Sequence, residues 1–93
     1  MAFKYELSEE LEKTLQKLLK KDKERYEIAW KKIEEIASRD STTIDFYKNL
    51  RHDFSEYKRV HIDKSFVLLF KVHKKENFIL FEKLMHHDDV YKR

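Results

Sequence analysis

The residues best suited to chemistry lie in the last third of the chain. Lys58, Arg59 and His61 share a segment in which polar and apolar side chains alternate, and His87 and Tyr91 follow about thirty residues later. An imidazole titrates near neutral pH and can accept or give a proton, while lysine and arginine bind phosphate groups. A strand and a short tail carrying these side chains would form a surface able to cleave RNA.

Cleavage of RNA by its own 2′-hydroxyl group needs three contributions from a protein. A base removes the hydroxyl proton, an acid protonates the 5′-oxygen leaving group, and cations or hydrogen-bond donors stabilise the phosphate. We expect His61 and His87 to be the base and the acid, and the sequence leaves open which has which role. His52 is a candidate for a third proton-transfer group. Tyr91 could stack on a base or donate its hydroxyl to the phosphate.

The candidate phosphate-binding residues are basic side chains in or near the same segment. Arg51, Lys58 and Arg59 are the strongest candidates, and Lys48 and Lys71 are weaker ones. Such residues supply most of the salt-sensitive affinity of a protein for a nucleic-acid backbone. The alternative is an ordinary solvated side chain, which describes most lysines in a chain that is 42% charged.

The run of two histidines and two aspartates at 86–89 also raises the question of a metal site. Neighbouring residues of a strand point to opposite faces of the sheet, so they chelate poorly, and the sequence has no second cluster at ligand spacing. We therefore expect no metal and no other cofactor.

Composition favours one small domain that spans residues 1–93. The net charge is +3, and the excess of positive charge falls entirely in residues 41–93, together with all five histidines. The absence of cysteine excludes disulfides and thiolate metal sites. No apolar run approaches the roughly 20 residues of a membrane span, and no signal-peptide pattern is present. We expect a cytoplasmic protein with no membrane partner.

Hydrophobic periodicity predicts one strand followed by two helices. Residues 2–7 alternate as in a half-buried strand, and Ser8 is suited to cap a helix whose leucines recur at helical spacing until about 21–22. A second apolar stripe runs from 26 to 37, which makes the pair a helical hairpin. We expect Trp30 and the leucines to pack in the core, and any apolar surface left exposed could dock a partner helix.

The second half of the chain predicts three strands. Residues 46–55 have no clear period and suggest a loop. The expected strands are 57–62, 66–72 and 78–85, separated by turns at 63–65 and 73–77. The predicted fold is α+β, with strands and helices in the order βααβββ followed by a short tail.

Four sequence motifs together resemble the RelE/ParE superfamily of small bacterial and archaeal toxins, over nearly the whole chain. They are YKNL at 47–50, YKRVH at 57–61, FVLLFKV at 66–72 and HDDVY at 87–91. The resemblance implies a helical hairpin packed on a small antiparallel sheet, a fold like that of microbial ribonucleases. The similarity is greatest to the RelE and YafQ branches. The YafQ type shares a histidine at the position of His61, and it shares the closing pattern of a histidine, three residues and then an aromatic residue, which is His87 to Tyr91 here. The position at which the YafQ type carries an acidic residue corresponds to Ser65 in this chain. Asp63 is the nearest acidic residue that could substitute for it.

This resemblance implies a toxin of a type II toxin–antitoxin system. Members of the RelE and YafQ branches are ribosome-dependent endoribonucleases that cut messenger RNA in the A site and inhibit translation. The implied partners are messenger RNA on the ribosome and a RelB-like antitoxin, whose amphipathic helix and acidic residues would wrap the hairpin and the sheet in a 2:2 complex. Two alternatives stay open: a gyrase-inhibiting toxin of the ParE kind, and an inactive member that only binds its antitoxin.

Overall fold

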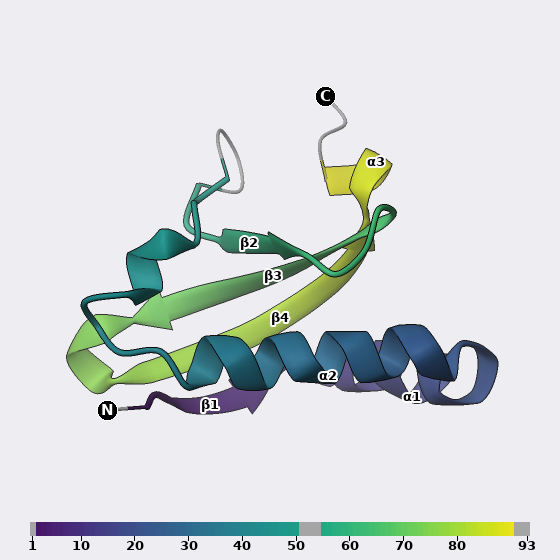
Figure 1. Cartoon of the computed structure of the whole chain (residues 1–93), viewed down its shortest axis with the longest axis horizontal. Coiled ribbons are helices and arrows are strands. Elements are labelled where there is room, and N and C mark those ends of the chain that lie inside the picture. The colour runs from purple at the N-terminus through teal and green to yellow at the C-terminus, as the bar shows by residue number, and fades with distance from the viewer. Residues whose placement is uncertain (1, 51–54, 91–93) are drawn as a thin grey trace.

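The computed structural model describes residues 2–50 and 55–90, and it has the predicted order of strands and helices (Figure 1). Two short 3-10 helices, η1 and η3, lie before β2 and between β3 and β4. The elements are β1 (Lys4–Leu7), α1 (Glu9–Lys21), α2 (Lys23–Ala37), η1 (Ile44–Phe46), β2 (Lys58–His61), β3 (Phe66–His73), η3 (Lys74–Glu76), β4 (Phe78–His86) and α3 (His87–Val90). The α+β class and the βααβββ order are thus confirmed.

The sheet has the strand order β1-β4-β3-β2. β2 pairs with β3 and β3 with β4 in antiparallel fashion, as predicted, whereas β1 lies parallel to β4. The sheet is therefore mixed rather than purely antiparallel. Alternation along residues 2–7 indicated a strand but not its partner. The connection from β1 to β4 is long and contains α1, α2, β2 and β3, so the two strands can pair in parallel.

Local capping explains where the helical hairpin starts and turns. The Ser8 hydroxyl accepts a hydrogen bond from the backbone N–H of Leu11 at 3.0 Å, which confirms the predicted N-cap of α1. Asp22 ends α1 and also caps α2, because its carboxylate accepts from the N–H of Arg25 at 3.1 Å. One residue thus breaks the long helical pattern into two antiparallel helices.

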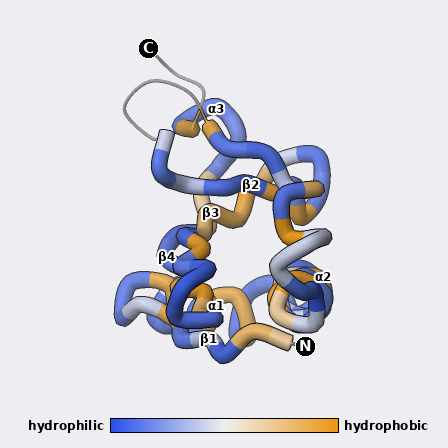
Figure 2. The backbone as a smooth tube through the Cα atoms, turned by 90° about the vertical axis from the view of Figure 1, so that its left-hand side faces the viewer, coloured by the Kyte–Doolittle hydropathy of each residue, from blue (hydrophilic) through white to orange (hydrophobic). Residues whose placement is uncertain are grey.

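The two faces of the sheet bury different clusters. The larger cluster joins the hairpin to the sheet through side chains such as Leu11, Ile33 and Phe70. The smaller cluster lies on the other face, where Val90 of α3 packs with Val67 and its neighbours. In both views α3 lies at the β2 side of the sheet, opposite the hairpin (Figures 1 and 2). α3 is thereby packed against β3 and β4.

The predicted hairpin core is only partly correct. Leu11 and Leu15 are buried, but Trp30 and Leu18 are half-buried and Leu19 is 47% exposed. The apolar stripe of the hairpin is therefore wider than the sheet that covers it. Within the described residues, no helix combines the length and the apolar character needed to cross a membrane.

Candidate active site

His61 and His87 come together at one corner of the sheet. β2 ends at His61, which pairs with Val67 of β3, and β4 ends one residue before His87. The backbone N–H of His87 donates to the carbonyl of Ser65 at 2.6 Å, so α3 starts against the turn that follows β2. The two imidazole centroids lie 5.5 Å apart with a tilt of 32°. Both predicted proton-transfer groups thus share one surface.

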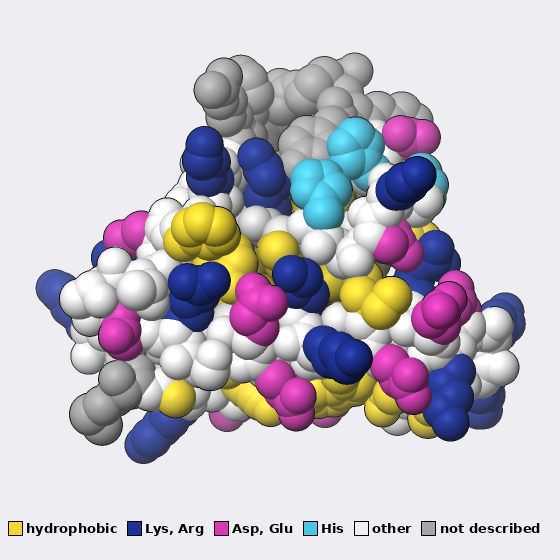
Figure 3. All heavy atoms as spheres, viewed as in Figure 1, with side chains coloured by type: hydrophobic (Ala, Val, Ile, Leu, Met, Phe, Trp, Pro, Cys, Tyr) yellow, Lys and Arg dark blue, Asp and Glu magenta, His cyan; other side chains and the backbone are white. Residues whose placement is uncertain are grey.

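Both histidines are accessible from outside the protein. His61 is exposed, and the His87 side chain keeps 43% of its surface accessible. The exposed Asp88 carboxylate lies 3.7 Å from Nδ1 of His87, which is longer than a hydrogen bond. Figure 3 shows histidine side chains next to each other on the face that also carries several Lys and Arg side chains.

A hollow of about 380 Å³ continues from His61 along β2 toward α2. Arg59 lies two residues before His61 on the same side of the strand, and its backbone N–H donates to the carbonyl of Lys48 at 3.0 Å. The 46–48 segment is thereby held beside β2. The lining residues are Lys32, Glu35, Phe46, Tyr47, Lys48, Arg59, Val60 and His61. The hollow is basic and ends at the His61 side chain.

Lys58 is placed differently from the prediction. Strand alternation directs it away from Arg59, and it is only 8% exposed. Its ammonium donates to the carbonyl of Tyr47 at 2.9 Å and to Oδ1 of Asn49 at 3.0 Å, and it forms an ion pair with Asp45 at 3.1 Å. Lys58 therefore supports the wall of the hollow from inside the protein and cannot act as a phosphate clamp from this position.

Lys71 is held at a distance from the histidines. Its ammonium forms ion pairs with Glu56 at 2.7 Å and Glu82 at 3.2 Å, and these two carboxylates raise the pKa of Lys71. It is four residues from Val67, the partner of His61, which corresponds to about 13 Å along β3. The structure thus separates Lys71 from the site and ties its charge to acidic neighbours.

A network on the α2 side of the hollow was not anticipated from the sequence. The Tyr47 hydroxyl donates to Glu35 Oε2 at 2.5 Å and accepts from Arg39 Nε at 3.2 Å. The hydrogen bond from Tyr47 holds the pKa of Glu35 below its usual range, while burial and the Glu35 carboxylate raise the pKa of Tyr47. Tyr47 belongs to the YKNL motif, but no sequence pattern identified Glu35 of α2, or Arg39 just after that helix, as its partners.

Asp63, the nearest acidic residue to the expected position, has a structural role. Its carboxylate accepts from the backbone N–H groups of Ser65 and Phe66 at 2.8 and 3.0 Å, and it bonds Arg25 Nε at 2.8 Å. Burial acts to raise the pKa of Asp63, but the hydrogen bonds from Arg25 and the two backbone groups outweigh it, so the pKa is lowered. Asp63 shapes the turn that precedes β3.

The remaining sequence predictions concern three further site residues and the question of a metal site. Arg51, His52 and Tyr91 lie outside the described residues, so their roles stay predictions. Over residues 2–50 and 55–90, no group of three or more His, Cys, Asp or Glu side chains is arranged to hold a metal ion. The site as described thus consists of His61 and His87 with Arg59 and Lys48.

Similar proteins show the family to which this chain belongs. A protein of Methanocaldococcus jannaschii named "Putative toxin RelE4" is 44% identical over 91 residues, which cover 98% of this chain and 93% of that protein. The chain belongs to the RelE toxin family. An uncharacterized protein of Methanosarcina mazei is 39% identical to this RelE-family toxin over 82 residues, or 88% of the chain and 91% of the relative. No family model matches the sequence.

Solved structures agree with the fold of this RelE-family toxin. A metal-bound toxin from Helicobacter pylori superposes with a TM-score of 0.72 at 19% identity, over 96% of this chain and 99% of that one. YafQ from E. coli superposes with a TM-score of 0.64 at 13% identity, over 96% and 98% of the two chains. The family relationship makes this chain a toxin of a toxin–antitoxin system and implies an antitoxin partner.

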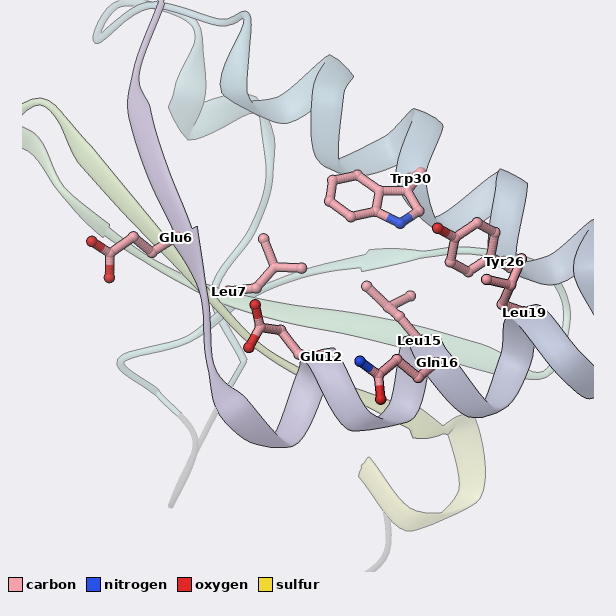
Figure 4. A pocket seen from close by; sticks show the side chains of 8 residues that line it. All are labelled: Glu6, Leu7, Glu12, Leu15, Gln16, Leu19, Tyr26 and Trp30. Atoms are coloured by element: carbon pink, nitrogen blue, oxygen red, sulfur yellow. The ribbon is translucent and has the colours of Figure 1, made fainter.

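The toxin has a second hollow, which lies between the two helices and the end of β1. It has a volume of about 540 Å³. Figure 4 shows Trp30 and Tyr26 of α2 across from Leu7 and Leu15, with Glu12 at the rim. The lining residues are Glu6, Leu7, Glu12, Leu15, Gln16, Leu19, Tyr26 and Trp30. This hairpin groove is apolar with an acidic edge, and it lies on a different part of the surface from the basic hollow.

Proposed function

We propose that this toxin is an endoribonuclease that cuts messenger RNA in the ribosomal A site and thereby inhibits translation. The observation that carries the proposal is the 5.5 Å separation of the His61 and His87 rings, next to a basic hollow. Two imidazoles at this separation can reach the 2′-hydroxyl and the 5′-oxygen on the two sides of one phosphate group. Lys48 and Arg59 would bind the phosphates on the approach to that linkage.

The proposed reaction uses only protein side chains and the RNA itself. One imidazole removes the proton of the 2′-hydroxyl, and the 2′-oxygen forms a bond to phosphorus. The bond from phosphorus to the 5′-oxygen breaks, and the other imidazole, in its protonated form, gives its proton to that oxygen. The products are a 2′,3′-cyclic phosphate and a free 5′-hydroxyl. Arg59 stabilises the negative charge that develops on the phosphate oxygens.

Toeprinting of a translated message tests this proposal directly. Purified toxin added to ribosomes that are translating a defined message should produce new 3′ ends within A-site codons, and the His87→Ala protein should not. The matched control is naked message, on which cleavage should be absent or much slower. Intact message on the ribosome together with inhibited DNA gyrase would support the ParE-like alternative instead.

We also propose that the cognate antitoxin places an apolar segment with basic flanking residues in the hairpin groove. Half-buried Trp30 and Tyr26 offer aromatic contacts, and such residues often dominate protein interfaces. Glu6 and Glu12 at the rim attract positive charge, whereas the acidic residues expected of the antitoxin would face the basic hollow. The expected assembly is a 2:2 complex.

A charge-reversal substitution distinguishes antitoxin binding in the hairpin groove from RNA cleavage at the active site. Glu12→Lys should weaken binding of purified antitoxin, measured by calorimetry, and leave cleavage of ribosome-bound message unchanged. Glu9→Lys, an exposed residue of the same helix that does not line the groove, is the matched control. Equal antitoxin affinity of the Glu12→Lys and parent toxins would exclude the groove as the docking site.

A further inference from the structure

Two large apolar side chains stand out from the surface of the described residues: Leu19, which is 47% exposed, and Phe46, which is 72% exposed. Leu19 lines the hairpin groove, so its exposure belongs to an apolar surface. Phe46 lines the basic hollow with Lys48, Arg59 and His61, where its neighbours are mostly charged or polar. An exposed aromatic ring in such surroundings has an unfavourable contact with water unless a ligand covers it.

We propose that Phe46 is a stacking platform for one base of single-stranded RNA, whose phosphates lie along Lys48 and Arg59. Proteins that bind single strands combine a basic groove with aromatic side chains on which bases stack. The proposal rests on the proposed function, because it takes RNA as the ligand of the same hollow. It adds a recognition site for a base to the groups that bind phosphate and transfer protons.

The Phe46 ring is held in place before any ligand arrives. Its ring meets that of Tyr47 edge to face, with centroids 5.6 Å apart and an interplanar angle of 85°. The Arg39 guanidinium lies 5.0 Å from its centroid and is fixed by the hydrogen bond from Nε to the Tyr47 hydroxyl. Tyr47 is itself anchored to Glu35. A preorganised ring loses little conformational entropy when a base stacks on it.

The charges around the ring favour RNA over a protein partner. The hollow contains Lys32, Lys48 and Arg59, and its one carboxylate, Glu35, is already bonded by Tyr47 and by Lys32 at 3.4 Å. Binding sites for a protein usually surround an aromatic anchor with further apolar contacts that exclude water. The other residues that line the hollow with Phe46 are mostly charged or polar, and its cations suit a ligand with an aromatic base and a charged backbone.

Binding of an uncleavable oligonucleotide tests the proposal. The probe is a labelled single strand of about six nucleotides in which deoxyribose replaces ribose, so the attacking 2′-hydroxyl is missing. Measured by fluorescence anisotropy, Phe46→Ala and Phe46→Leu should weaken binding roughly 5- to 150-fold, and Phe46→Tyr should restore it. Leu19→Ala, which removes an exposed apolar side chain outside the hollow, should bind as the parent does.

An abasic version of the same strand gives the decisive comparison. The parent and the Phe46→Ala protein should bind it equally, because no base is left to stack. The proposal is overturned if the parent binds neither strand, or if Phe46→Ala binds the complete strand as tightly as the parent does. It is also overturned if Phe46→Ala loses the same affinity for the complete and the abasic strand. Loss of antitoxin binding alone would make Phe46 a protein contact and would also overturn it. Base-dependent binding without cleavage on the ribosome would refute the proposed function and leave this inference standing.

Discussion

The buried ammonium of Lys58 donates to the backbone carbonyl of Tyr47 at 2.9 Å. This contact ties the segment before β2 to the strand itself, and the ion pair with Asp45 and the hydrogen bond to Asn49 reinforce it. The next residue, Arg59, faces the basic hollow. Two consecutive basic residues are therefore placed differently: Lys58 supports the wall of the hollow from inside the protein, and Arg59 lines the hollow itself.

The first prediction is that Lys58→Ala mainly destabilises the fold. The substitution leaves the Tyr47 carbonyl without its donor and removes buried alkyl packing, which together should lower the free energy of unfolding by about 2 kcal/mol. Urea denaturation measures this change. Lys64→Ala, at an exposed position of the turn after β2, should leave the unfolding midpoint unchanged. Full stability with weakened RNA binding would show that Lys58 contacts phosphate after all.

The second prediction concerns proton transfer by His61 and His87. Each alanine variant should lose about 10²- to 10⁴-fold in the single-turnover rate of cleavage while the protein stays folded, because each removes one partner of the acid–base pair. The double variant should lose little more than the worse single one. The rate of the parent should rise and then fall with pH, since one imidazole must be neutral and the other protonated.

His73 provides the matched control for these variants. It lies at the other end of β3, where its ring stacks on Phe78 with centroids 5.9 Å apart. His73→Ala should therefore cleave at the parental rate. Normal cleavage by both His61→Ala and His87→Ala would remove the acid–base mechanism and leave positioning of the RNA as the source of catalysis.

The third prediction distinguishes basic residues that contact phosphate from a basic residue that is already ion-paired, by the salt dependence of RNA binding. Arg59→Ala and Lys48→Ala should each weaken affinity for single-stranded RNA and lower the slope of log K against log salt by roughly 0.7, because each removes one phosphate contact. Lys71→Ala should leave the slope unchanged, because Glu56 and Glu82 already bind its charge. If all three alanine variants lowered the slope equally, the basic residues would act through their long-range charge and not through individual phosphate contacts.

The fourth prediction concerns stability at low pH. The pKa of Asp63 is lowered in the folded protein, so its bonds to Arg25 and to the backbone stabilise the fold above the ordinary value of 3.8. This contribution is lost as the pH falls through the lower folded pKa. Asp63→Asn should therefore reduce the free energy of unfolding by about 1–2 kcal/mol at pH 7, and by progressively less as the pH is lowered below 3.8. A constant difference between the two proteins across this range would contradict the assignment.

Local sequence patterns were sufficient to predict the four strands, the two long helices and the strand that carries Arg59 and His61. Periodicity located both helices, Ser8 marked the start of α1, and alternation along β2 directed Val60 to the core and His61 to the surface. These features depend on neighbours within a few residues, so a local pattern contains them. The composition of the second half also indicated the basic character of this surface before any fold was known.

Which of these residues lie together depends on contacts between distant parts of the chain. The tertiary structure brought His61 and His87 to one corner through the pairing of β2, β3 and β4, while it turned Lys58 inward and placed Lys71 between two carboxylates. It also set β1 parallel to β4 and brought Glu35 of α2 to Tyr47. The reason is that strand order and helix packing join residues far apart in the chain, and a local pattern has no access to those distances.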